Sequence, residues 1–354
     1  LQIDQASKLI NSAKDPAKTE FYYSRDQNNI ALNGLPLNVI GANQTLKLPA
    51  VAKTKKAELM ALVDIQKNQL TLSKKVIEKE VTTAYSKYVY WQSVAGLYQY
   101  LDSIYGVFES SAIKRLEVGE GNVLEKLTAT TKRNEVSIGK NHAETMAGNA
   151  LVDIKRWTNV GEETIEVDKN FSVPFVPNLN ASDQPQLQAH LLNLALAKTQ
   201  VSSTASLKLP ELSFSAFMGF NKLSNARYYP GIYAGIAVPL FGKAFDSKQE
   251  AARINQEIMA KEIDIYQINF EHNKQQLLTE MSHYTTAVNL YLTQGIQTQK
   301  QLIDGIQKAF KLGEIDVFEY IFTIEAATQL ELNYLDNKFQ YNLKATDYNY
   351  LINP

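Results

Sequence analysis

The chain has 354 residues, a formal net charge of −1 and 45% hydrophobic residues. This balance excludes a strongly basic nucleic-acid-binding protein and an intrinsically disordered chain. Cysteine is absent, which excludes disulfides, thiolate metal sites and a lipidated cysteine within this stretch.

Proline placement divides the sequence. No proline occurs in 50–173 or in 240–353. Proline costs about 3 kcal/mol inside a helix, so these two tracts predict long helices. Neither contains a run of about 18 apolar residues, and we expect no helix to cross a bilayer.

The first half, 1–157, is predicted to contain a short helix followed by two strands and two long helices. The expected bounds are a helix at 3–13, strands at about 19–25 and 37–48, and helices at about 50–116 and 122–157. The strands are separated by a predicted loop containing Asn28, Asn29, Asn33, Gly34 and Pro36. Residues 158–184 are predicted to form a middle (equatorial) segment with one short strand.

The second half, 185–354, is predicted to repeat the order of the first. The expected bounds are helices at about 186–206, 243–311 and 316–352, and strands at about 209–220 and 230–241. Residues at a 4-3-4-3 spacing predict coiled-coil packing in both halves. They are Val81, Tyr85, Tyr88, Gln92 and Ala95, and Leu277, Met281, Tyr284, Val288 and Tyr291. A shift of 192 also pairs Ile40 with Ile232 and Leu48 with Leu240.

A short motif occurs in the middle of each proline-free tract. A shift of 194 aligns Gly119 with Gly313 and Asn122 with Asp316. Glycine adopts left-handed dihedrals at no Cβ penalty, and Asn or Asp caps a helix start. Each motif therefore predicts the tip of a helical hairpin, with Asn122 and Asp316 as caps.

Four strands in one chain make an incomplete barrel. Along each predicted strand, the side chains of one face are apolar and those of the other face are small or polar, as in membrane barrels. Closure by copies of the chain would remove the open edges. We therefore expect a mixed α/β membrane channel with two tandem strand-strand-helix-helix repeats. Three chains would complete a twelve-stranded β-barrel from 17–49 and 207–242, with a coaxial α-helical coiled-coil barrel.

The order of elements resembles the outer membrane efflux protein (TolC-like) family. The motifs that carry the resemblance are Leu209-Pro210, the strand-to-helix passage Ala237-Val-Pro-Leu-Phe-Gly242 and the doubled Gly-Glu tips. Within the family, Lys18–Phe21, Gln44–Pro49 and Glu117–Lys126 look most like the channel components of heavy-metal efflux pumps of the resistance-nodulation-division class.

The resemblance implies an outer-membrane duct with a periplasmic extension, assembled as a homotrimer and embedded in outer-membrane lipid. It implies an entrance gate at Glu125 and Glu319. Contacts with a periplasmic adaptor (membrane fusion) protein would fall on Val118, Gly119, Leu312 and Gly313. Some relatives carry the inner-membrane pump fused ahead of this module, so either a pump segment or a signal peptide is expected before Leu1. A second acidic ring of some relatives would fall on Phe322, where this sequence departs.

Other interpretations remain open from the sequence. Drug-efflux and type I secretion ducts share the fold implied by the resemblance. A soluble coiled-coil scaffold explains the 4-3-4-3 seams but not the alternating strands. A helical-bundle metalloenzyme would need clustered ligands, and the four histidines are dispersed. We find no catalytic constellation, and we expect no cofactor, no metal site and no nucleic-acid partner.

Overall fold

The structure is a computed structural model that describes residues 1–161, 165–176, 184–221, 228–239 and 242–352. It contains two compact units. The first combines Leu1–Leu72 with Pro185–Ile268, and the second combines Ser73–Gln184 with Asn269–Pro354. Each unit therefore contains residues from both halves of the sequence.

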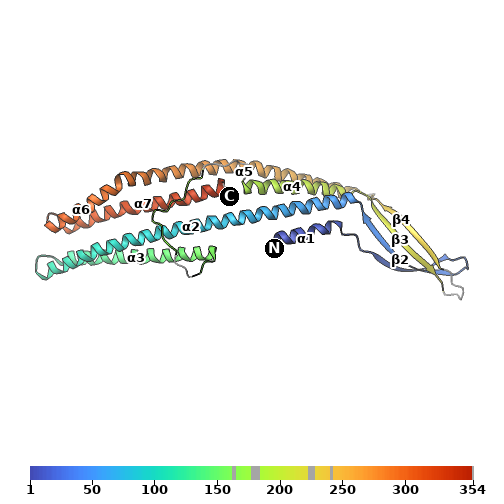
Figure 1. Cartoon of the computed structure of the whole chain (residues 1–354), viewed down its shortest axis with the longest axis horizontal. Coiled ribbons are helices and arrows are strands. Elements are labelled where there is room, and N and C mark those ends of the chain that lie inside the picture. The colour runs from blue at the N-terminus through green and yellow to red at the C-terminus, as the bar shows by residue number, and fades with distance from the viewer. Residues whose placement is uncertain (162–164, 177–183, 222–227, 240–241, 353–354) are drawn as a thin grey trace. The chain divides into compact units, whose positions relative to one another are not determined.

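The first unit contains a four-stranded antiparallel sheet (Figure 1). Its strands are β1 (Glu20–Ile30), β2 (Pro36–Lys47), β3 (Glu211–Phe220) and β4 (Tyr229–Ala237). They pair in the order β1-β2-β3-β4. Within the described chain, β1 and β4 are therefore edge strands with one hydrogen-bonded neighbour each.

The two faces of this sheet differ in chemistry. The register places Phe21, Ala42, Ala216 and Ile232 in one row across the four strands. Side chains alternate between faces along a strand, so this row and the rows two residues away share one face. Phe21 is 82% exposed and Ile232 is 90% exposed on that face. A large apolar surface of this kind marks contact with a partner or a membrane.

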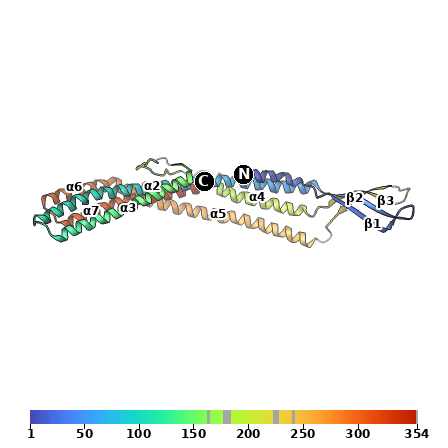
Figure 2. The ribbon, with the colours of Figure 1, turned by 90° about the horizontal axis from the view of Figure 1, so that it is seen from below.

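Helices complete the first unit. They are α1 (Gln2–Leu9) with a 3-10 helix at Ile10–Lys14, α4 (Pro185–Ser206), and the first parts of α2 (Pro49–Glu117) and α5 (Lys243–Leu290). Figure 2 shows these helices from a second direction. Polar side chains join α2 to α4: Thr54 Oγ1 lies 3.0 Å from Ser206 Oγ, and Asn68 Nδ2 donates to the Pro185 carbonyl at 2.9 Å. Among the described helices, none contains an apolar stretch of the length needed to span a bilayer.

The second unit is a helical bundle. It contains α3 (Val123–Thr158), α6 (Ile296–Leu312), α7 (Val317–Ile352) and the remaining parts of α2 and α5. Residues at the predicted 4-3-4-3 spacing are buried or half-buried, as Tyr88 and Met281 illustrate. Alanines Ala129, Ala143 and Ala147 on α3 are almost fully buried, because small side chains permit close helix packing.

The helix expected at 243–311 is interrupted, which corrects the prediction. A π-helical turn at Tyr291–Gly295 separates α5 from α6. The Tyr291 ring fills the space beside Gly295, where a Cβ would lie 2.6 Å from its Cδ2. The Tyr291 hydroxyl donates to Gln299 Oε1 at 2.6 Å, and burial raises the pKa of Tyr291 to about 12. Gln299 Nε2 also donates to the Ala327 carbonyl of α7, so the extra residue of the π turn serves a tertiary contact.

The described part of the middle segment, 158–161, 165–176 and 184, contains no strand. The other residues in which a short strand is predicted, 162–164 and 177–183, lie outside the described residues. Side chains from the helices satisfy the backbone of the described part instead of a neighbouring strand. Tyr85 of α2 donates to the Glu166 carbonyl, and Asn342 of α7 accepts from the Val173 N–H at 2.9 Å. The Phe175 ring stacks on Tyr348 at 5.2 Å.

Strand bounds also differ from expectation. β1 continues to Ile30, so Asn28 and Asn29 lie in the strand and the turn is confined to 31–35, where Gly34 has a φ of 76°. β3 begins at Glu211, and β4 ends at Ala237 instead of continuing to 241. Leu240 and Phe241 lie outside the described residues, as do residues 222–227 between β3 and β4.

The hydrogen bond between Asn342 and the middle segment can be tested by substitution. Asn342→Ala leaves the Val173 N–H buried without its acceptor, because Asn342 and Val173 are 3% and 4% exposed. We expect a loss of about 1–3 kcal/mol in the free energy of unfolding. The matched control is Asn333→Ala at an exposed position of α7. This substitution should change the free energy of unfolding by less than about 0.5 kcal/mol. Equal effects of the two substitutions, measured by denaturant unfolding, would contradict this role.

Candidate functional site

The two hairpin tips have the same backbone geometry. Gly119 and Gly313 have φ values of 77° and 74°. After the first glycine, the Glu120 N–H donates to the Arg115 carbonyl at 2.9 Å; after the second, the Glu314 N–H donates to the Ala309 carbonyl at 3.0 Å. This is the helix-ending pattern in which a left-handed glycine closes the last turn.

Each following helix begins with a side-chain cap. Asn122 Oδ1 accepts from the Glu125 N–H at 2.8 Å, and Asp316 Oδ1 accepts from the Glu319 N–H at 2.8 Å. The caps satisfy backbone donors that the first helical turn leaves unpaired. The structure therefore gives both predicted caps their expected contacts, and both tips are short and locally determined.

The predicted gate residues lie in different environments. The Glu125 side chain is 20% exposed, and its Oε2 lies 4.0 Å from Arg115 Nη1. Asn122 Nδ2 also approaches Glu125 Oε1, at 3.5 Å. Glu319 is exposed, and no ion pair is recorded for it among the described residues. The two carboxylates occupy matching sequence positions, but a cation partly neutralises only Glu125.

The residues predicted to contact an adaptor are exposed and apolar, and they lie at the hairpin tips. Val118 is 70% exposed and Leu312 is 72% exposed, and Gly119 and Gly313 beside them are also exposed. Exposed aliphatic side chains at a hairpin tip are available for contact with another protein.

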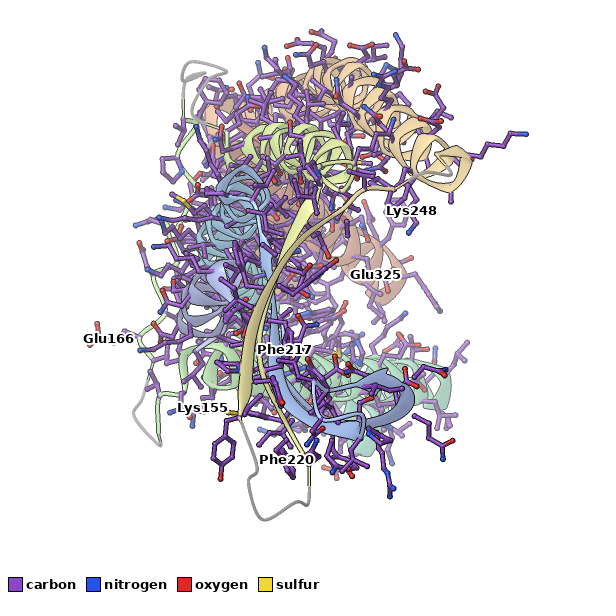
Figure 3. The ribbon with its side chains drawn as sticks, turned by 90° about the vertical axis from the view of Figure 1, so that its right-hand side faces the viewer. Lys155, Glu166, Phe217, Phe220, Lys248 and Glu325 are labelled. Carbon is purple, nitrogen blue, oxygen red and sulfur yellow. The ribbon has the colours of Figure 1, made fainter. Side chains whose placement is uncertain are left out.

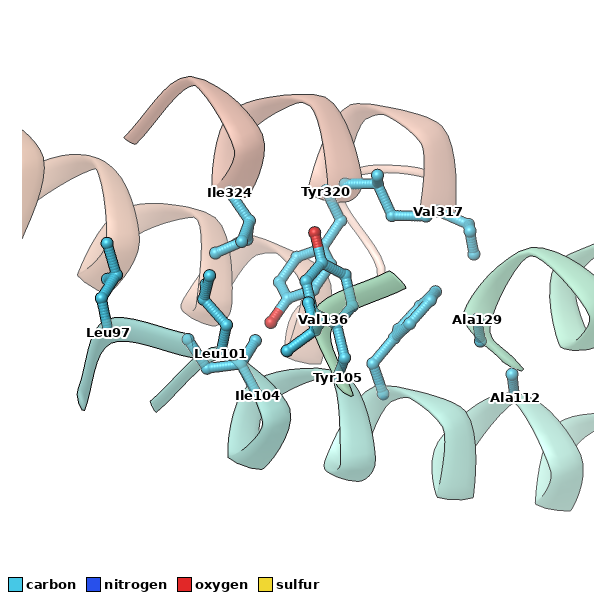
Figure 4. Close-up of a cluster of buried hydrophobic side chains, with 12 residues drawn as sticks. Leu97, Leu101, Ile104, Tyr105, Ala112, Ala129, Val136, Val317, Tyr320 and Ile324 are labelled. Atoms are coloured by element: carbon cyan, nitrogen blue, oxygen red, sulfur yellow. The ribbon is translucent and has the colours of Figure 1, made fainter. Parts of the chain in front are cut away.

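An apolar base of packed side chains lies beside the tips. Three aromatic rings from three helices pack together: Phe108 of α2, Phe310 of α6 and Tyr320 of α7. The centroids of Phe310 and Tyr320 are 4.6 Å apart. Phe108 and Tyr320 belong to a larger buried cluster that includes Ile104, Ala129 and Ile324 (Figure 4). Phe310 is partly buried and packs against this cluster. Sequence reasoning missed this base, because Phe108 is far from Phe310 and Tyr320 in the chain.

Ion pairs connect α3 to its neighbours near the tips. Arg133 Nη1 donates to Glu109 Oε2 of α2 at 2.8 Å, and Lys132 Nζ lies 2.7 Å from Glu325 Oε1 of α7. Hydrogen bonds from Arg133 and Thr130 hold the pKa of the Glu109 carboxyl below its usual range. Hydrogen bonds to Glu135 and Glu325 raise the pKa of the Lys132 ammonium.

A groove of about 800 Å³ lies beside the tips and is lined by α2, α6 and α7. Val107, Phe108 and Phe310 supply apolar lining, and Arg115 and Glu120 supply charges. Leu312 and Gly313 are also part of the lining. The groove thus joins a predicted adaptor-contact point to the aromatic base.

The described residues contain no group of three or more His, Cys, Asp or Glu side chains placed to hold a metal ion. Instead, histidines pack against aromatic rings. The His142 ring meets the Trp91 ring edge-on at 5.4 Å, and the His190 ring lies 5.0 Å from the Tyr266 ring.

Comparison with solved structures places this fold among outer membrane channels. The CmeC outer membrane channel of Campylobacter jejuni is 14% identical, with a TM-score of 0.79 over 99% of this chain and 81% of that one. The outer membrane protein VceC of Vibrio cholerae is 12% identical, with a TM-score of 0.75 over 99% and 90%. The MtrE outer membrane channel of Neisseria gonorrhoeae, in its open state, is 13% identical, with a TM-score of 0.79 over 99% and 83%. No protein-family model and no curated protein sequence matches the chain.

The tip geometry predicts opposite effects for two glycine substitutions. Gly313→Ala places a Cβ in the left-handed region and should lower the free energy of unfolding by about 1–2 kcal/mol. Gly96→Ala lies inside α2, where a Cβ meets nothing within 4 Å, and should raise it by about 0.5–1 kcal/mol. Denaturant unfolding of both variants in the same detergent would measure these changes in the free energy of unfolding. A Gly313→Ala variant more stable than the wild type would refute the tip geometry.

Proposed function

We propose that this chain is the outer-membrane exit duct of a tripartite efflux system. It conducts substrate passively from the periplasm to the exterior and performs no chemistry. The observation that carries the proposal is the likeness of 99% of the chain to outer membrane channels, at TM-scores of 0.75 to 0.79 for the three described above. The exposed apolar face of the sheet supports it independently.

A homotrimer is the proposed assembly. Three chains with four strands each would give a twelve-stranded barrel in which edge strands β1 and β4 of neighbouring copies pair. The face with Phe21 and Ile232 would then contact outer-membrane lipid. The proposed barrel segments are 17–49 and 207–242, and the helices of the two sequence repeats would continue it as a periplasmic tunnel. A soluble coiled-coil scaffold gives no reason for that apolar face.

The hairpin tips are the proposed periplasmic entrance. Val118, Gly119, Leu312 and Gly313 would contact the hairpin of a periplasmic adaptor protein, which links the duct to an inner-membrane pump of the resistance-nodulation-division class. Their exposure supports this assignment. Glu125 and Glu319 are the proposed gate, because three copies of each carboxylate around an axis would attract cations.

The proposed cargo is cationic. The sequence resemblance favours heavy-metal ions, and the proposed duct would conduct them without a dedicated binding site. Drug-efflux ducts and type I secretion ducts are the alternatives with the same fold.

Recordings of ionic current across planar bilayers test the duct and its gate together. The purified chain should form cation-preferring pores. Glu319→Gln should reduce the cation preference about twofold, and more than Glu125→Gln does, since Arg115 already offsets Glu125. The measurement is the reversal potential in a salt gradient.

The matched control is Asp4→Asn, which removes a carboxylate from an 80%-exposed side chain of α1 outside the hairpins. Its pores should resemble the wild type. Wild-type protein that never inserts would contradict the duct, whereas pores with unchanged selectivity in both gate variants would contradict only the gate assignment.

A further inference from the structure

The second face of the sheet carries a row of alternating aromatic residues and glycines. The register aligns Tyr22, Gly41, Phe217 and Gly231 across β1, β2, β3 and β4. Phe217 lies in the middle part of β3, and Phe220 ends that strand (Figure 3). The row lies on the face opposite Phe21 and Ile232, because Tyr22 and Gly231 are their immediate neighbours in the strands.

Each ring of the row lies over the glycine of the next strand. A Cβ built on Gly41 would lie 2.6 Å from Cζ and from the hydroxyl of Tyr22. A Cβ built on Gly231 would lie 2.2 Å from Cζ of Phe217. The Tyr22 hydroxyl lies 3.2 Å from Ser215 Oγ on β3, which fixes the direction in which the ring leans. The glycines therefore make room for rings that lean across the sheet, with one ring face turned away from the backbone.

A third aromatic ring on this face lies over a glycine of its own strand. Tyr233 of β4 is 59% exposed, and a Cβ on Gly235 would lie 2.7 Å from its hydroxyl. Three aromatic residues of one chain thus cover glycines on the face that carries few aliphatic side chains.

Charge is segregated onto this face as well. Among the strand residues paired in the register, it carries the carboxylates of Glu20, Asp26 and Glu211 against the single ammonium of Lys47. The opposite face carries one charged residue in the same register, Arg25. Glu211 is paired with Lys47 in the register, so Glu20 and Asp26 leave this face with a net negative charge. That charge and the half-buried rings of Tyr22 and Phe217 suit a cation, because the face of an aromatic ring is negative.

We propose that the row of Tyr22 and Phe217 is a weak binding site for organic cations, of the quaternary-ammonium or protonated-amine class, as they pass through the duct. This inference rests on the proposed function, in which trimer closure turns this face toward the lumen. Open aromatic faces recognise quaternary ammonium groups. A conducted ion must enter and also leave, so a site of low affinity fits a duct. This face therefore favours organic cations among the cationic cargoes of the proposed duct.

The test uses block of potassium current through the full chain in planar bilayers, with benzyltrimethylammonium as the probe. The half-blocking concentration should rise about fivefold in the double variant Tyr22→Leu, Phe217→Leu. The matched control is Phe21→Leu, Phe214→Leu, which changes one aromatic residue on each of the same two strands on the opposite face. The control should change that concentration by less than about twofold.

Two further measurements keep the proposal falsifiable if the double variant fails to assemble. Tyr22→Phe retains the ring and loses only the hydroxyl contact with Ser215, so it should be blocked like the wild type. On the wild type, benzyltrimethylammonium should block at a concentration at least about tenfold lower than neutral benzyl alcohol or Zn²⁺. Equal block by the three probes, or equal weakening in the double variant and its control, would overturn the site.

The outcomes separate the two proposals. If no pore forms, the proposed duct fails and this inference fails with it. If cation-preferring pores form but organic cations block no better than the neutral probe, the duct stands and only the aromatic site is lost.

Discussion

The open sheet is the constraint on which the rest of the structure depends. Within the described chain, β1 and β4 each have one hydrogen-bonded neighbour, so each presents a row of unpaired backbone groups. The sheet also exposes an apolar face that includes Phe21 and Ile232. Unpaired edges and apolar faces are both unfavourable in water. Pairing between copies would satisfy the backbone groups of the strand edges, and contact with lipid would cover the apolar face. The proposed trimeric duct follows from these two requirements.

The two hairpin tips show how a repeated motif acquires different electrostatics. Both use a left-handed glycine and an Asn or Asp cap three residues later. Only the first has an arginine near its glutamate, because Arg115 corresponds to Ala309 in the second tip. In a trimer the entrance would therefore alternate between compensated and uncompensated carboxylates. The six tips of such an entrance would have similar backbones and so approach sixfold symmetry. Their charges would differ between the two tips of each chain and so have only threefold symmetry.

Sequence reasoning succeeded where the determining interactions are local. A glycine followed by a capping residue is sufficient to end one helix and begin the next, and alternating residues indicate a strand with two different faces. It failed where distant side chains decide the local structure. The π turn at Tyr291–Gly295 depends on Gln299 reaching Ala327 of α7. The contacts of Tyr85 and Asn342 with described residues of the middle segment likewise join distant parts of the chain. None of these contacts has a signal in the local sequence, and the aromatic row becomes visible only once the strand register is known.

The mass of the protein extracted in mild detergent tests the central claim most directly. If neighbouring copies complete the sheet, the protein component of the purified complex should contain three chains of 39.8 kDa, and the complex should need detergent to remain dispersed. Native mass spectrometry would measure the number of chains, and size-exclusion chromatography after detergent removal would measure whether the complex remains dispersed. A monodisperse single chain that is stable in buffer without detergent would contradict the account.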